Sequence, residues 1–163
     1  MTYKEFKSKC SAEISDQASD PIIRDLSTKW FNKANAHCYS YHFEWLGRPL
    51  IQYPLDIVQF QETVFQVCPD LIIETGIAHG GSLVLSASLL CMLDVMNGID
   101  PRQSKRKVVG IDIDIRAHNR MALDSHPLRF KMDLIEGSSV HPAIVEKVNK
   151  LAKGTEKVLV SLD

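Results

Sequence analysis

The sequence lacks the marks of several protein classes. It has no run of about 18 apolar residues, so no segment is expected to cross a bilayer. Its net charge of −1 gives no positive surplus to attract nucleic acid. The four cysteines form no Cys-x-x-Cys pair, which argues against a zinc or redox motif. Scattered cysteines and a polar N-terminus without a signal-peptide core favour a cytoplasmic location.

The 163 residues, of which 45% are hydrophobic, are enough for a globular core. We divide the chain into a helical and aromatic lead-in, residues 1–54, and a ligand-binding half-domain, residues 55–163. Within the lead-in, Asp20 and Pro21 predict a helix start, because Asp caps free N–H groups and Pro fits the first turn. Residues 37–54 are aromatic and broken by glycine and proline, which fits either a lid over a site or a packed loop.

After residue 55, apolar segments of strand type and of helix type alternate. Short runs rich in β-branched residues predict strands at 71–73, 108–113, 129–135 and 157–162. Helical patterns separate them at 82–96, 116–123 and 140–150. This alternation predicts an α/β fold with a parallel sheet of order 3-2-1-4, the first half of a doubly wound, Rossmann-like fold. Because the fourth strand would be an uncovered edge, we expect a further chain segment or a second copy to complete the sheet.

The stretch from Asp70 to Ser82 joins the first predicted strand to its helix. Glu74 closes the apolar run, and a turn with Gly76, Gly80 and Gly81 follows. Glycine permits tight turns and a close approach of a ligand to the backbone. A strand, a glycine-rich turn and a helix N-terminus together predict a nucleotide-type cradle at the carboxyl edge of the sheet.

Polar residues follow each of the other predicted strands. Asp112 and Asp114 end the second strand, Ser138-Ser139 follows the third, and Asp163 follows the fourth. Strand ends of a parallel sheet share one crevice, where ligands bind. A carboxylate after the second strand can accept hydrogen bonds from the two hydroxyls of a ribose. Only one of Asp112 and Asp114 needs to face the ligand for this. Glu74 suits an ammonium group, and a ligand with both features is S-adenosylmethionine.

Two other functions remain open on the residues alone. An NAD-dependent oxidoreductase is disfavoured, because Gly76 is followed by Ile-Ala-His before Gly80 and no Gly-x-Gly-x-x-Gly is formed. A non-catalytic remnant or assembly module would keep the fold without the reaction. His79 in the glycine turn is either a ligand contact or an exposed loop histidine.

Four motifs carry a resemblance to a known family. Residues 69–83, 110–120, 135–139 and 158–163 resemble the cephalosporin hydroxylase / rhamnosyl O-methyltransferase family, and residues 53–62 are similar to its lead-in. The resemblance covers residues 40–163. It implies a class I methyltransferase fold that uses S-adenosylmethionine. It also implies O-methylation of a hydroxyl on a small molecule or a sugar, in a lipid (glycolipid) or an antibiotic-like biosynthetic process.

The resemblance further implies a role for each candidate residue that binds the cofactor. Glu74, Gly76 and Ser82 would line the methionine end. Asp112 would hold the ribose hydroxyls. Ser138 and Ser139 would lie beside the adenine.

The resemblance also allows a Mg2+ ion, with Asp163 at the position of a metal ligand. Magnesium prefers carboxylates and substrate oxygens, and it could lower the pKa of an acceptor hydroxyl. Family members continue through further strands that supply the other metal acids and most of the acceptor pocket. We therefore expect this chain to bind the cofactor but to be incomplete for catalysis.

Overall fold

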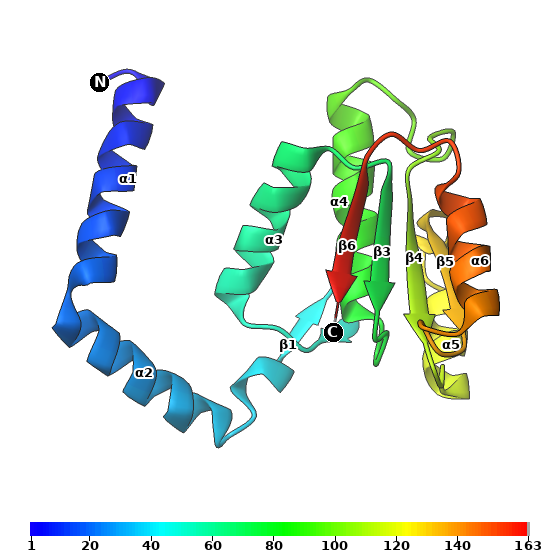
Figure 1. Cartoon of the computed structure of the whole chain (residues 1–163), viewed down its shortest axis with the longest axis horizontal. Helices are drawn as coiled ribbons and strands as arrows, with labels where there is room; N and C mark the ends of the chain where they lie inside the picture. The colour runs from blue at the N-terminus through cyan, green and yellow to red at the C-terminus, as the bar shows by residue number, and fades with distance from the viewer. Residues whose placement is uncertain (163) are drawn as a thin grey trace. The chain divides into compact units, whose positions relative to one another are not determined.

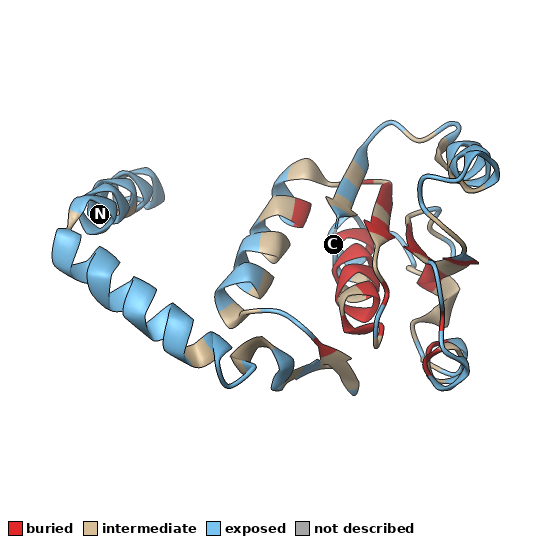
Figure 2. Cartoon of the chain, turned by 60° about the horizontal axis from the view of Figure 1, so that its bottom comes forward, coloured by how far each residue is buried: buried red, intermediate tan, exposed pale blue. Residues whose placement is uncertain are grey.

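The computed structural model describes residues 1–162, which fall into two compact units with their boundary in the chain between Tyr39 and Ser40. The first unit holds helices α1 (Tyr3–Ser19) and α2 (Pro21–Asn35). The Asp20 side chain accepts hydrogen bonds from the N–H groups of Ile22 and Ile23, which confirms the predicted helix start. Both helices are mostly exposed (Figure 2), and neither has a buried residue. None of the helices within residues 1–162 is long and apolar enough to cross a bilayer.

The second unit begins with a small hairpin. The 3-10 helix η1 (Tyr39–Tyr41) leads to β1 (Phe43–Trp45) and β2 (Arg48–Leu50), which pair antiparallel. Leu46 and Gly47 form the turn, with φ of 45° and 82°. Positive φ at both positions is typical of a type I′ turn, whose twist suits a hairpin. The glycine and proline residues of 37–54 predicted a lid or a packed loop without regular strands, and the hairpin corrects that prediction.

A four-stranded parallel sheet forms the centre of the second unit (Figure 1). Its order is β5-β4-β3-β6, which is the predicted order 3-2-1-4. The strands are β3 (Leu71–Thr75), β4 (Lys107–Asp112), β5 (Met132–Glu136) and β6 (Val158–Leu162). The helices are α3 (Pro54–Val67), α4 (Gly81–Met96), α5 (Ala117–Asp124) and α6 (Pro142–Ala152). The predicted α/β class is confirmed.

Two apolar clusters cover the faces of the sheet. On one face, Ile72 and Val108 pack with residues of α3, α4 and α5. On the other face, Val109 and Ile111 pack against α6. Buried residues gather on β3, β4 and α4 in Figure 2. A strand buried on both faces reads as a continuous apolar run, which is why these strands could be predicted.

The third predicted strand begins later than expected. Residues Arg129–Lys131 form the 3-10 helix η2, and β5 starts only at Met132. Lys131 is only 1% exposed, and its Nζ lies 2.5 Å from Oδ2 of Asp94 on α4. Arg106 Nη1 lies 2.6 Å from the other carboxylate oxygen of Asp94, and Ser104 Oγ donates to it at 2.7 Å. This buried ion network joins the end of α4 to the beginnings of β4 and β5.

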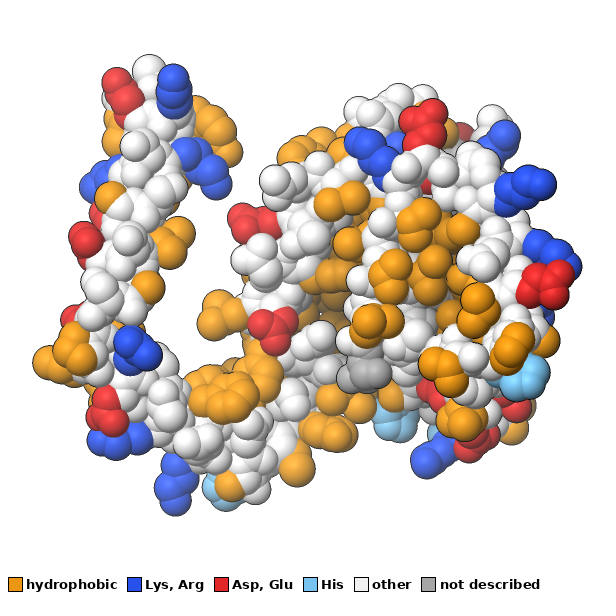
Figure 3. All heavy atoms as spheres, in the orientation of Figure 1, with side chains coloured by type: hydrophobic (Ala, Val, Ile, Leu, Met, Phe, Trp, Pro, Cys, Tyr) orange, Lys and Arg blue, Asp and Glu red, His pale blue; other side chains and the backbone are white. Residues whose placement is uncertain are grey.

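One side of the sheet stays open at β6. Val158, Val160 and Leu162 lie in register with Leu71, Ile73 and Thr75, on the face that carries α6. Val160 is 54% exposed and Leu162 is 77% exposed. Figure 3 shows hydrophobic side chains gathered over this part of the unit. Covering of this edge by a further segment or a second copy stays a prediction.

The Asp94 network gives a test of stability. Burial alone would raise the pKa of Asp94, but hydrogen bonds from Lys131, Arg106 and Ser104 lower it below its ordinary value. Asp94→Asn leaves the buried Lys131 without a carboxylate, so we expect a loss of about 3–5 kcal/mol in the free energy of unfolding. Chemical denaturation at neutral pH measures it.

The matched control is Asp133→Asn. Asp133 lies 3.7 Å from Lys107 in a partly exposed pair, so its removal should cost about 1 kcal/mol or less. Equal losses for the two variants would contradict a structural role for the buried network. Because the pKa of Asp94 is lowered on folding, its contribution is present at neutral pH and is lost as the pH falls through the folded-state value.

Candidate functional site

The glycine loop, residues 76–80, joins β3 to α4. The Gly76 N–H donates to the Ile111 carbonyl at 2.9 Å, and the Gly80 N–H donates to the Ile77 carbonyl at 2.7 Å. Gly76 and Gly80 have φ of 81° and 83°, which favours glycine at both positions. Ala78 has φ of 45°, an uncommon conformation for a residue with a side chain. The loop therefore has a tight, partly strained backbone.

A cavity of about 170 Å³ opens beside this loop. Three of the predicted cofactor-binding residues, Glu74, Gly76 and Ser82, line it. Glu74 is only 4% exposed, and its carboxylate accepts a hydrogen bond from the Ser82 hydroxyl. The remaining walls come from the end of the hairpin, the glycine loop, the start of α4 and β6, with lining residues Pro49, Ile51, Gln52, Ile77, Ala78, His79, Gly81, Ser161 and Leu162.

Asp112, the last residue of β4, binds the backbone of the glycine loop, which follows the neighbouring strand β3. Its Oδ2 accepts the N–H of Ile77 at 2.7 Å and the N–H of Ala78 at 3.3 Å. Its Oδ1 accepts the N–H of Asp114 at 3.1 Å. Burial alone would raise the pKa of Asp112, but these backbone donors lower it below the ordinary value, so the carboxylate is ionised at neutral pH. Asp112 does not line the cavity; it contacts the loop backbone.

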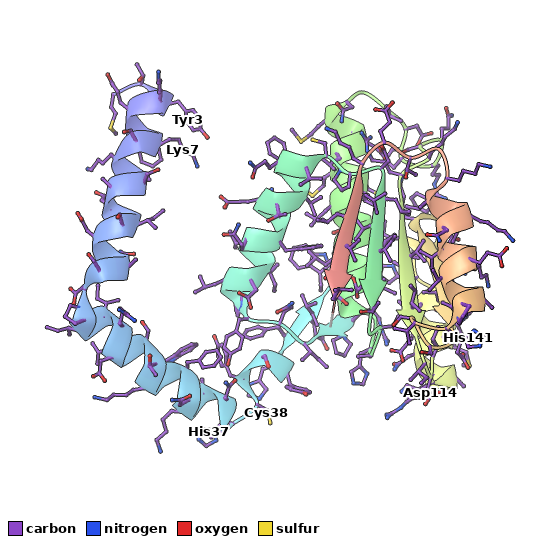
Figure 4. The ribbon with its side chains drawn as sticks, in the orientation of Figure 1. Tyr3, Lys7, His37, Cys38, Asp114 and His141 are labelled. Carbon is purple, nitrogen blue, oxygen red and sulfur yellow. The ribbon has the colours of Figure 1, made fainter. Side chains whose placement is uncertain are left out.

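The next strand end lies beside Asp112. The N–H of Gly137, just after β5, donates to the Asp112 carbonyl at 2.8 Å, and Ser138 and Ser139 follow. Neither serine caps α6, because His141 takes that position and its Nδ1 accepts the Ala143 N–H at 3.3 Å. Figure 4 labels His141 and the exposed Asp114 at the arrowhead end of the strands. The serines are thus at the predicted edge but not in the cavity of Glu74.

The predicted metal ligand, Asp163, lies outside the described residues. Within residues 1–162, no three His, Cys, Asp or Glu side chains are grouped so that they could hold a metal ion.

Three structural features of the site were not predicted. The aromatic segment folds into a packed hairpin: Trp45 Nε1 donates to Ser88 Oγ at 3.0 Å, and Leu50 is buried. Gly81 meets this hairpin so closely that a Cβ there would lie 2.2 Å from the Pro49 carbonyl oxygen. Arg48 and Asn119 also bind the glycine loop. Arg48 carries no recognisable sequence signal, whereas Asn119 falls within the motif of residues 110–120.

The family of the chain follows from its sequence. The sequence model described as Rhamnosyl O-methyltransferase/CmcI matches residues 37–163. The chain belongs to this family. The match includes the hairpin, the glycine loop and the strand ends described above.

Solved structures of CmcI resemble the chain, and no curated protein sequence matches it. An apo form of CmcI is 22% identical, with a TM-score of 0.49, over 74% of this chain and 45% of that one. A form with Mg and SAM is 19% identical, with a TM-score of 0.49, over 76% and 46%. A form with SAH is 21% identical, with a TM-score of 0.41, over 68% and 58%. The chain spans about half the length of these structures.

Replacing Asp112 tests how the glycine loop is held. Asp112→Asn removes a charged acceptor of the Ile77 and Ala78 amides, so we expect a loss of about 1.5–3 kcal/mol in the free energy of unfolding at pH 7. The loss should shrink in acid: the pKa of Asp112 is lowered in the folded protein, so its contribution exists above the ordinary value of about 3.9 and disappears as the pH falls through the folded value.

Asp114→Asn is the control, because the exposed Asp114 contributes its backbone N–H, which the substitution leaves in place. We expect a change within about 0.5 kcal/mol for it. Denaturant unfolding of both variants between pH 7 and acid pH measures the difference. A loss for Asp112→Asn that does not depend on pH would show that its charge does not hold the loop.

Proposed function

We propose that this chain is the cofactor-binding part of an S-adenosylmethionine-dependent O-methyltransferase. Membership of a family named for O-methylation supports this. The observation that carries the proposal is the buried carboxylate of Glu74, which lines the cavity and accepts the Ser82 hydroxyl at the first turn of α4.

This carboxylate separates two classes of cofactor. In a dinucleotide-binding fold, the helix N-terminus after the first strand receives the pyrophosphate. Here the Glu74 carboxyl group lies at that helix start, and in its ionised form its negative charge opposes a pyrophosphate. The same charge favours a ligand with a positive group, such as the ammonium of a methionine end. The cavity therefore supports S-adenosylmethionine over NAD.

Asp112 suits the ribose of this cofactor. Its carboxylate is ionised. Oδ2 already accepts two loop amides, whereas Oδ1 accepts the Asp114 N–H and offers its second lone pair to a ribose hydroxyl. Ser138 and Ser139 follow the neighbouring strand and are assigned to the adenine. Gly76, with its positive φ, lets the loop backbone approach the ligand.

The bound cofactor would supply a methyl group that is already activated for transfer to a hydroxyl oxygen. The contribution of this chain is then to hold and orient the cofactor, since alignment of the reacting atoms is a large part of catalysis. We assign the methyl acceptor to the class of small molecules or saccharides, including glycolipids. We place the protein in the cytoplasm. The proposal that Asp163 is a Mg2+ ligand rests on the family resemblance.

Calorimetric titration with S-adenosylmethionine and with NAD tests the proposal. We expect the wild-type chain to bind S-adenosylmethionine and to prefer it over NAD. Glu74→Gln removes the buried charge, so its Kd for S-adenosylmethionine should rise about tenfold or more.

Glu62→Gln is the matched control, because Glu62 is exposed on α3 and lies outside the cavity. Its Kd should equal that of the wild type. Preference for NAD, or equal Kd values for Glu74→Gln and the wild type, would overturn the proposal.

A further inference from the structure

Arg48 of β2 reaches across to the glycine loop. Its Nε and Nη2 donate to the His79 carbonyl oxygen at 2.9 Å and 2.6 Å. Nη2 also donates to Oδ1 of Asn119 at 3.0 Å. The planar fork of arginine suits such multiple contacts, and a lysine ammonium cannot reproduce them. Arg48 therefore joins the hairpin, the loop and α5 through one side chain.

Asn119 holds the neighbouring peptide group of the same loop. Its side chain is only 3% exposed on α5, and its Nδ2 donates to the Ala78 carbonyl oxygen at 2.8 Å. Both ends of its amide are thus used, because Oδ1 accepts from Arg48. Two successive carbonyls, those of Ala78 and His79, are fixed by buried or half-buried side chains from two other elements.

These bonds bear on the conformation of the loop. A peptide group is planar, so a fixed carbonyl also fixes the direction of the following N–H. Ala78 has φ of 45°, a conformation that persists only where its surroundings hold it. Asp112 accepts the amides of Ile77 and Ala78, and Arg48 and Asn119 donate to the carbonyls of Ala78 and His79. The strained backbone is therefore held through both its donors and its acceptors.

We propose that Arg48 and Asn119 are positioning residues of the cofactor site. They do not line the cavity, whereas Ala78 and His79, whose carbonyls they bind, do. They act by keeping the glycine loop in the conformation that binds the ligand, and they make that conformation depend on the hairpin and on α5. This assignment rests on the proposed function and extends it to two residues outside the cavity.

The test compares Arg48→Lys with Arg120→Lys. The control residue is a partly exposed arginine on α5 that pairs with Asp124 and does not contact the loop. We expect Arg48→Lys to raise the Kd for S-adenosylmethionine about tenfold, while its melting temperature stays close to that of Arg120→Lys. In the ligand-free protein, hydrogen exchange of the amides of residues 77–80 should become faster in Arg48→Lys alone.

Asn119→Ala is the second variant, which decides the question if Arg48→Lys does not fold. It removes the donor to the Ala78 carbonyl and should show the same weaker binding and faster exchange in the loop. Unchanged Kd and unchanged loop exchange in a folded variant would overturn the positioning role. A fall in melting temperature with exchange raised across the whole second unit would also overturn it, because the role would then be purely structural.

The two proposals fail in different ways. If the wild-type chain does not bind S-adenosylmethionine, the proposed function is wrong, and the exchange data on the ligand-free loop still decide whether Arg48 and Asn119 position it. If the wild type binds and both variants bind equally well, only the positioning role is wrong.

Discussion

The site depends on the hydrogen bonds from the Ile77 and Ala78 amides to the Asp112 carboxylate. They join the end of β4 to the loop that follows β3. In the chain, Asp112 is 35 residues from Ile77 and 34 residues from Ala78. Parallel pairing of β3 with β4 brings these points to one edge. Hydrogen bonds to a charged carboxylate are stronger than those to a neutral acceptor. The same bonds lower the pKa of Asp112, so that the carboxylate stays charged. Strand register, loop shape and ionisation therefore support one another.

The glycine loop also connects the carboxyl edge of the sheet to the hairpin and to α5. Its carbonyls are held by Arg48 and Asn119, and its following residue, Gly81, meets the hairpin backbone. A rigid loop fits the proposed task, because a site that is formed before the ligand arrives loses less entropy on binding. The end of the hairpin is thus one wall of the cavity, and the buried Glu74 is another part of its lining. In the proposed function, the charge of the Glu74 carboxylate favours a cationic ligand group.

Sequence reasoning found those parts of the fold that have local causes. The buried strands read as apolar runs, and Asp20 with Pro21 marks a helix start, so element order and sheet order could be predicted. The hairpin could not, because its strands are three residues each, Pro49 lies in one, and its turn begins with Leu46 instead of the usual Asn or Asp. Arg48 and Asn119 are 71 residues apart, and no local pattern joins them. The ion pair of the buried Lys131 with the distant Asp94 was likewise not predicted, and β5 begins only after Lys131.

A crystal structure of this chain with S-adenosylhomocysteine, the unreactive product form of the proposed cofactor, tests the central claim most directly. The account predicts ribose hydroxyls within hydrogen-bond distance of the Asp112 carboxylate, the amino-acid end beside Glu74 and Ser82, and a glycine loop unchanged from the ligand-free protein. A ligand that binds away from Asp112 and Glu74, or a loop that must open to admit it, would contradict the account.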